Sequence, residues 1–108
     1  MTMLPKLVRD KIPNLIRESG KDSKGHIADF SEYSIRIIDK MKEELAEFQE
    51  SPCLDEAADL YEVFISMLKN WNMKLTDVEN TAKIKREIRG GFAQGIVLDK
   101  VFDIPMER

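Results

Sequence analysis

The stretch KMKEELAEFQESPCLDEAADLYE, from Lys40 to Glu62, decides the fold because it joins two helical patterns through a short break. Ser31 is a good N-cap for the first helix, since its hydroxyl can accept a hydrogen bond from a free helix amide. The triplet Ser51–Cys53 interrupts the pattern, and a second helix is expected from about Leu54 to Trp71. The apolar residues that recur at helical spacing in the first helix are Ile37, Ile38, Met41, Leu45 and Phe48. A short break of this kind predicts an antiparallel helix hairpin.

The second helix of this hairpin is apolar around most of its circumference. At about 100° per residue its apolar side chains span roughly 220°, whereas an ordinary surface helix has an apolar stripe of about 100°. Such a helix needs cover on several sides, which two or three other helices of a 108-residue chain do not provide. We therefore expect a homodimer or a homotetramer.

Three further segments complete the predicted fold. The apolar residues of Ile12–Ile16 suit a short helix that ends at Gly20, and a third long helix is expected over about Thr76–Arg89, ended by the glycines that follow it. The tail GIVLDKVF, Gly95–Phe102, is β-branched and alternating enough for a short strand or an extended arm. The expected fold is an all-α helical bundle over residues 1–108. It is one domain with four helices per subunit, or one completed by dimerisation, and it carries a short C-terminal extended segment.

Charge is unevenly distributed along the chain, although the net charge is only -3. Eight of the 20 acids lie between Glu43 and Leu68, where there is no lysine or arginine, which leaves 12 acids against all 17 basic residues elsewhere. This separation suggests that the acidic region holds a cation and that an anion binds nearby. Nucleic acid is not expected as a partner, because no extended basic stripe with interleaved aromatic residues occurs.

Cysteine content and hydropathy indicate the compartment. The single cysteine, Cys53, excludes an internal disulfide and is typical of a reducing environment. No apolar run reaches membrane-spanning length, and Met1–Lys11 lacks the apolar core of a signal peptide. The sequence therefore predicts a cytoplasmic protein with no membrane partner.

The acids around the break form one pair on each predicted helix. Glu44 and Glu47 are three residues apart, and Glu44 lies within about 20° of Ile37 on the helical wheel, at the edge of the packing face. Glu56 and Asp59 have the same spacing on the second helix. Carboxylates that face each other across a hairpin repel strongly unless a cation lies between them.

A cation held by carboxylate oxygens alone is expected to be a hard ion. Mg²⁺ suits such ligands, with Mn²⁺ as the alternative. A di-iron site requires a Glu-x-x-His motif on two helices, and a zinc site requires nitrogen or sulfur ligands. The chain has one histidine, His26, which lies in a predicted loop, so both metals fit poorly. The alternative to a metal site is an ordinary solvated acidic face.

The acidic residues also resemble a known signature. EELAE (Glu43–Glu47) followed by EAAD (Glu56–Asp59) is similar to the EExxE…ExxD motif of the MazG-like, all-α nucleoside triphosphate pyrophosphohydrolase superfamily. KLVRDKIP (Lys6–Pro13) and KREIRGGF (Lys85–Phe92) resemble its phosphoribosyl-ATP pyrophosphohydrolase-like branch. The resemblance extends from about residue 6 to residue 98. Only eight residues separate the two acidic motifs, fewer than in many members of the superfamily. This leaves less room for a substrate loop between the helices, so no base selectivity is predicted from the longer relatives.

The resemblance implies Mg²⁺-dependent hydrolysis of a nucleoside triphosphate between the α- and β-phosphates, giving a monophosphate and pyrophosphate and serving to clean the nucleotide pool. Glu44, Glu47, Glu56 and Asp59 would hold the metal, and Glu44 and Glu47 are the predicted catalytic residues. Glu43 falls away from Glu44 on the wheel and is expected on the helix surface or behind the ligands. Two alternatives stay open: a phosphoribosyl-ATP pyrophosphohydrolase, and a non-catalytic metal-binding helical dimerisation module.

A triphosphate also needs positively charged protein groups. The resemblance favours Arg9, Lys11, Arg86 and Arg89 as substrate-binding residues over the other basic side chains. Arg86 and Arg89 are three residues apart and should share a helix face. The alternative for each basic cluster is an ordinary solvated face.

Overall fold

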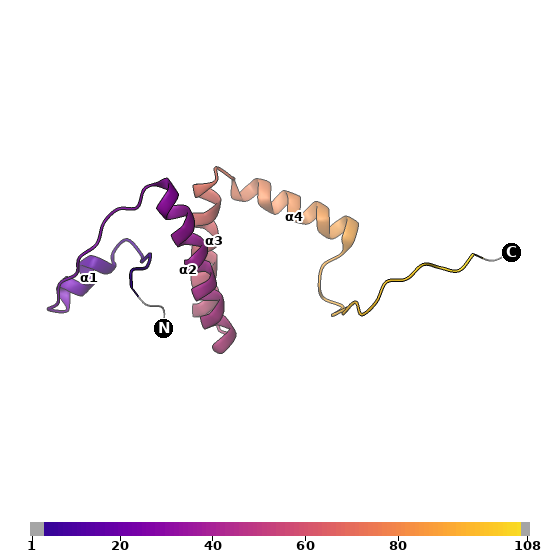
Figure 1. The fold of residues 1–108 in the computed structure, drawn as a ribbon, viewed down its shortest axis with the longest axis horizontal. Helices are drawn as coiled ribbons and strands as arrows, with labels where there is room; N and C mark the ends of the chain where they lie inside the picture. Colours follow the sequence, from indigo (N-terminus) through magenta and orange to yellow (C-terminus); the bar gives the residue numbers. More distant parts are fainter. Residues whose placement is uncertain (1–3, 107–108) are drawn as a thin grey trace. The chain divides into compact units, whose positions relative to one another are not determined.

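The computed structural model describes residues 4–106, which form four α-helices and no strand (Figure 1). The helices are α1 (Ile12–Glu18), α2 (Phe30–Glu50), α3 (Leu54–Asn70) and α4 (Leu75–Arg89). The predicted all-α class is confirmed. The strand considered for the C-terminal tail is not formed, since residues 96–106 have no regular secondary structure. None of the described helices is both long enough and apolar enough to cross a membrane.

The chain divides into two compact units, Met1–Leu75 and Thr76–Arg108. The first unit contains α1, α2 and α3, and the second contains nearly all of α4 and the C-terminal segment. The single domain expected over residues 1–108 stays a prediction. The acidic motifs both lie in the first unit, which is therefore the part of the chain that positions the candidate site.

The start of α2 differs from the sequence expectation. The N-cap is Asp29 and not Ser31, because the Asp29 side chain accepts a hydrogen bond of 2.9 Å from the backbone N–H of Glu32. Aspartate caps a helix as well as serine does, and its negative charge also suits the helix dipole. Glu32 then pairs with Arg36 one turn further on, at 3.1 Å, which supports this first part of the helix.

Helices α2 and α3 lie side by side as the predicted hairpin (Figure 1). Their contact buries Ile37 of α2 and Val63 and Leu68 of α3, which are the buried apolar side chains of the described chain. α3 ends just before Asn72, whose φ of 56° lies in the left-handed region that asparagine tolerates better than most residues. Because only Ser51–Cys53 connects α2 to α3, the last turns of α2 lie beside the first turns of α3.

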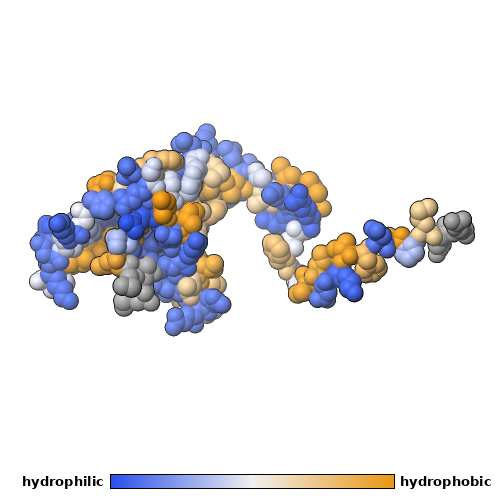
Figure 2. Space-filling model, in the orientation of Figure 1, coloured by the Kyte–Doolittle hydropathy of each residue, from blue (hydrophilic) through white to orange (hydrophobic). Residues whose placement is uncertain are grey.

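Much apolar surface remains exposed in both units, and it is visible as orange atoms in Figure 2. On α3, Leu54 and Tyr61 are 87% and 55% exposed. No described residue of the second unit is buried. Its exposed large apolar side chains are Ile84, Ile88, Phe92, Ile96, Val97, Leu98, Val101, Phe102, Ile104 and Met106.

Candidate metal centre

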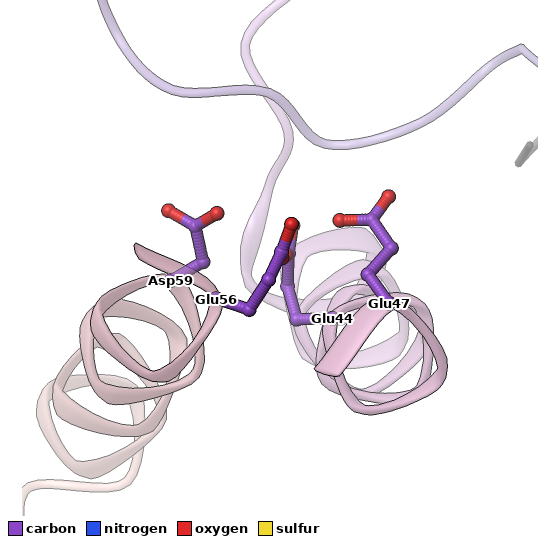
Figure 3. Close-up of side chains that lie close together, drawn as sticks. All are labelled: Glu44, Glu47, Glu56 and Asp59. Atoms are coloured by element: carbon purple, nitrogen blue, oxygen red, sulfur yellow. The ribbon is translucent and has the colours of Figure 1, made fainter. Parts of the chain in front are cut away.

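Four carboxylates meet on one side of the α2–α3 hairpin. Glu44 and Glu47 extend from α2, Glu56 and Asp59 extend from α3, and all four side chains rise toward the same side (Figure 3). One oxygen of each lies within 4.8 Å of one oxygen of every other. Because only Ser51–Cys53 separates the two helices, each i,i+3 pair is held opposite the other. The structure therefore brings together the four acids that the sequence singled out.

Burial differs among these four side chains. Glu44 is only 7% exposed, Glu56 and Asp59 are half-buried, and Glu47 is exposed. Among the described residues, Oε2 of Glu44 and Oε2 of Glu56 are buried oxygens without a hydrogen-bond partner. A buried carboxylate oxygen without a donor is costly, so each of these atoms calls for a cation or a proton.

The pKa values of Glu44 and Glu56 reflect the same cost. Burial raises the pKa of Glu44 above 4.5, and the negative charge of Glu47 raises it further, while Lys40 acts in the opposite direction. Burial also raises the pKa of Glu56, followed by the charges of Glu47 and Asp59. The cluster therefore resists carrying its full negative charge without a compensating cation.

Glu43 lies behind this cluster and does not join it. Its side chain is 9% exposed and accepts hydrogen bonds from Lys6 Nζ at 3.3 Å and from Lys40 Nζ at 3.4 Å. Burial acts to raise the pKa of Glu43, but Lys40 and Lys6 outweigh it and the pKa is lowered. Two positions were expected for Glu43, and the structure gives the one behind the ligands. The reason is that the N-terminal segment, residues 4–11, covers this side of α2 through Pro5 and Lys6.

Lys40 is a site residue that the sequence reasoning missed. Its Nζ lies 3.4 Å from Oε1 of Glu44 as well as 3.4 Å from Oε2 of Glu43. Lys40 lies just outside the stretch Glu43–Leu68 and is not among the predicted site residues. The available signal was its spacing, since it precedes Glu43 by three residues and Glu44 by four, and both spacings bring side chains together on a helix.

The predicted substrate-binding residues are placed differently from one another. Arg9 reaches the cluster, with Nη2 2.7 Å from Oδ1 of Asp59. Lys11 is the exposed N-cap of α1 and makes no ion pair with another described residue. Arg86 and Arg89 lie in the last turn of α4, in the second unit, and both are exposed.

The donor set fits the metal that the sequence predicts. Carboxylate oxygens alone suit Mg²⁺ or Mn²⁺ and suit zinc poorly. The unpartnered oxygens of Glu44 and Glu56 are free to act as ligands without breaking an existing hydrogen bond. The four carboxylates can therefore hold a hard divalent cation between α2 and α3.

Comparisons with protein-family models, with curated proteins and with solved structures found no match to this chain. The resemblance to the MazG-like superfamily stays a prediction that rests on the motifs quoted above.

Proposed function

We propose that the protein is a Mg²⁺-dependent nucleoside triphosphate pyrophosphohydrolase of the MazG-like class. It would cleave its substrate between the α- and β-phosphates, giving a nucleoside monophosphate and pyrophosphate, and so clean the nucleotide pool. The observation that carries the proposal is the meeting of Glu44, Glu47, Glu56 and Asp59 with oxygens within 4.8 Å of one another. Two of these acids also have a buried oxygen that accepts no hydrogen bond from residues 4–106.

Each of the four acids has a role that follows from its surroundings. Glu44 is buried and held by Lys40, so it is a fixed ligand, and Glu56 and Asp59 complete the site from α3. Glu47 is the exposed member, and its carboxylate can orient the attacking water and accept a proton from it. Bound Mg²⁺ would supply neutralisation of phosphate charge and a lowered pKa of its water.

Positive side chains supply the rest of the substrate site. Arg9, beside Asp59, carries the planar guanidinium that suits phosphate oxygens. We assign Lys11, Arg86 and Arg89 to substrate binding as well, on the motif resemblance. The exposure of Arg86 and Arg89 leaves their donors available to a ligand.

We propose further that the protein assembles as a homodimer or a dimer of dimers. The described chain buries Ile37, Val63 and Leu68 but leaves Leu54 and Tyr61 of α3 open to solvent. Covering apolar surface in this way stabilises an assembly by roughly 25 cal/mol per Å². A second copy of the chain supplies the cover that the wide apolar arc of α3 requires.

The deciding experiment is a panel of nucleoside triphosphates and phosphoribosyl-ATP, each incubated with Mg²⁺ and assayed for pyrophosphate release. Release from one or more ordinary triphosphates supports the proposal, whereas activity confined to phosphoribosyl-ATP favours the narrower enzyme. Glu56→Gln should be inactive, and Glu62→Gln, an exposed acid of the same helix, is the matched control. If the folded protein releases no pyrophosphate from either substrate type, a non-catalytic metal-binding dimerisation module is favoured.

A further inference from the structure

A depression of about 340 Å³ lies between the N-terminal segment and α2, beside Lys40 and Glu43. Pro5, Lys6 and Leu7 line one side of it, and α2 supplies the others, which are Arg36, Asp39, Lys40 and Glu43. A water molecule occupies about 30 Å³ in the liquid. The depression therefore has room for a polyatomic ion.

The basic side chains of this depression retain free hydrogen-bond donors. Lys6 and Lys40 share one carboxylate, that of Glu43, whose two oxygens are each taken by one lysine. A lysine ammonium group has three N–H donors. Lys6 uses one of them on Glu43, and Lys40 uses at most two on Glu43 and Glu44. Each lysine can thus donate to an additional anion without losing its present partner.

The remaining charges of the depression do not cancel this positive character. The side chains that line the depression carry three positive charges, on Lys6, Arg36 and Lys40, and two negative ones, on Asp39 and Glu43. Lys40 is also shared with Glu44 outside the depression. Asp39 is exposed, where water and salt screen its charge. Arg36 is held in place by hydrogen bonds to the Pro5 carbonyl at 3.2 Å and to Glu32 at 3.1 Å, which fixes the wall that it forms.

Lys40 connects the depression to the acidic cluster. It lines the depression, and its Nζ also lies 3.4 Å from Oε1 of Glu44. A phosphate chain that is anchored at the four carboxylates through a cation and extends toward the start of α2 would reach Lys40, which contacts Glu44, and then Lys6, which contacts Glu43. Charge-assisted hydrogen bonds to phosphate oxygens are among the stronger ones that proteins make.

We propose that this depression, through Lys6 and Lys40, binds the terminal phosphates of a polyphosphate chain whose other end lies at the acidic cluster. The inference rests on the proposed function and names the side chains that would hold the departing pyrophosphate. It assigns to Lys6 and Lys40 a role that neither the acidic motifs nor the four predicted basic residues cover.

The test is isothermal titration of the full-length protein with inorganic tripolyphosphate at saturating Mg²⁺. Loss of one charge-assisted hydrogen bond should weaken tripolyphosphate binding about ten- to a hundredfold in Lys40→Gln and in Lys6→Gln. Lys42→Gln is the matched control, because Lys42 is an exposed lysine of the same helix that does not line the depression. Circular dichroism checks that each variant is folded. If Lys40→Gln does not fold, Lys6→Gln still tests the proposal, because Lys6 lies outside α2.

A second titration, with Mn²⁺ alone, separates the depression from the metal site. Lys6→Gln removes a cation that touches Glu43 and none of the four clustered acids, so Mn²⁺ binding should be unchanged in this variant while tripolyphosphate binding falls. Parallel losses of Mn²⁺ and tripolyphosphate affinity would overturn the proposal, as would variants of Lys6 and Lys40 that match the Lys42 control. The proposal would also be overturned if the lysine variants weaken the binding of inorganic phosphate without metal as much as they weaken the binding of tripolyphosphate with Mg²⁺. The depression would then be an anion site that is independent of the acidic cluster. These readouts do not depend on turnover, so a protein that binds tripolyphosphate as expected but hydrolyses no nucleotide supports the phosphate site and contradicts the proposed reaction.

Discussion

Arg9 donates a hydrogen bond of 2.7 Å from Nη2 to Oδ1 of Asp59, which lies 50 positions later in the chain. This contact ties the N-terminal segment to α3 at the acidic cluster, as the contact between Lys6 and Glu43 ties it to α2. Two of the four clustered acids therefore already have a cationic side chain beside them, since Lys40 Nζ also lies 3.4 Å from Oε1 of Glu44. The Arg9 side chain is 56% exposed, so it can turn from the carboxylate to a phosphate.

Replacing Arg9 by glutamine should separate catalysis from stability. An exposed ion pair contributes about 0.2–1 kcal/mol, so the melting temperature should change little. Turnover of a triphosphate should fall about ten- to a hundredfold if Arg9 binds phosphate oxygens. The measurement is kcat/KM beside a melting curve, with Arg17→Gln, an exposed arginine of α1, as control. Unchanged kinetics would restrict Arg9 to holding the N-terminal segment.

Mg²⁺ should stabilise the wild-type protein and should not stabilise variants of the cluster. An ion that binds only the folded state adds about 2.7 kcal/mol at a concentration one hundred times its Kd. Glu56→Gln or Asp59→Asn should lose this increase and the Mg²⁺-dependent activity, while Glu62→Gln keeps both. In metal-free buffer Glu56→Gln should match or exceed the wild-type melting temperature, because neutralising this acid relieves its repulsion. A wild-type melting temperature that does not respond to millimolar Mg²⁺ would point to a solvated acidic face.

The raised pKa of Glu56 predicts how this stability difference depends on pH. An acid whose pKa in the folded protein is raised stabilises the fold below its ordinary pKa of 4.5, and that contribution is lost as the pH rises through the raised value. Glutamine stays neutral throughout. The advantage of Glu56→Gln over the wild type should therefore be largest near pH 7 and should vanish as the pH falls toward 4.5. Urea unfolding in EDTA at several pH values measures it, and an advantage that is independent of pH would contradict the assigned burial.

The hairpin and its acidic cluster could be predicted from the sequence because both depend on local spacing. Helical periodicity gave the limits of α2 and α3 to within one or two residues, and the i,i+3 spacing placed Glu44 with Glu47 and Glu56 with Asp59. The prediction of Ser31 as the N-cap of α2 was wrong, because Asp29 is an equally good capping residue two positions earlier and is the one that caps the helix. Only the contact between the Asp29 side chain and the Glu32 amide decides between them.

The contacts made by the N-terminal segment could not be predicted in this way. Lys6 and Glu43 are 37 positions apart, and no periodicity relates a segment outside the helices to one side of α2. The burial of Glu43 follows from that covering, whereas the two contacts of Lys40 follow from its spacing within α2. A helical wheel treats any side away from the hairpin as solvent, which is why it allowed a surface position for Glu43.

Assembly should depend on the exposed apolar side of α3. Tyr61 is 55% exposed, so Tyr61→Lys should weaken dimer formation without opening the core of the hairpin. A charge at the half-buried Ile65 should also weaken assembly before it affects metal binding. Light scattering at micromolar concentration measures the mass, with Glu62→Lys as the control at an exposed polar position of the same helix. A monomeric wild type would contradict the proposed homodimer or homotetramer.

The last prediction concerns Arg86 and Arg89, which share the last turn of α4. Neither forms an ion pair with another described residue, although Glu79 and Glu87 lie on the same helix. Each guanidinium is therefore free to bind an anion, and losing one charge-assisted hydrogen bond costs roughly 1.5–3 kcal/mol. At about 1.4 kcal/mol per tenfold change, Arg86→Ala or Arg89→Ala should lower kcat/KM for a triphosphate about ten- to a hundredfold.

Binding of Mg²⁺ without nucleotide should be unchanged in both arginine variants, because neither residue is among the clustered carboxylates. Lys85→Ala removes an exposed charge from the same helix and is the matched control for a general electrostatic effect. Melting curves should show little change, since both arginines are exposed. If kcat/KM stays at the wild-type value in both variants, α4 does not contribute to the phosphate site, and the positive charge must come from Arg9 and Lys11 together with Lys6 and Lys40.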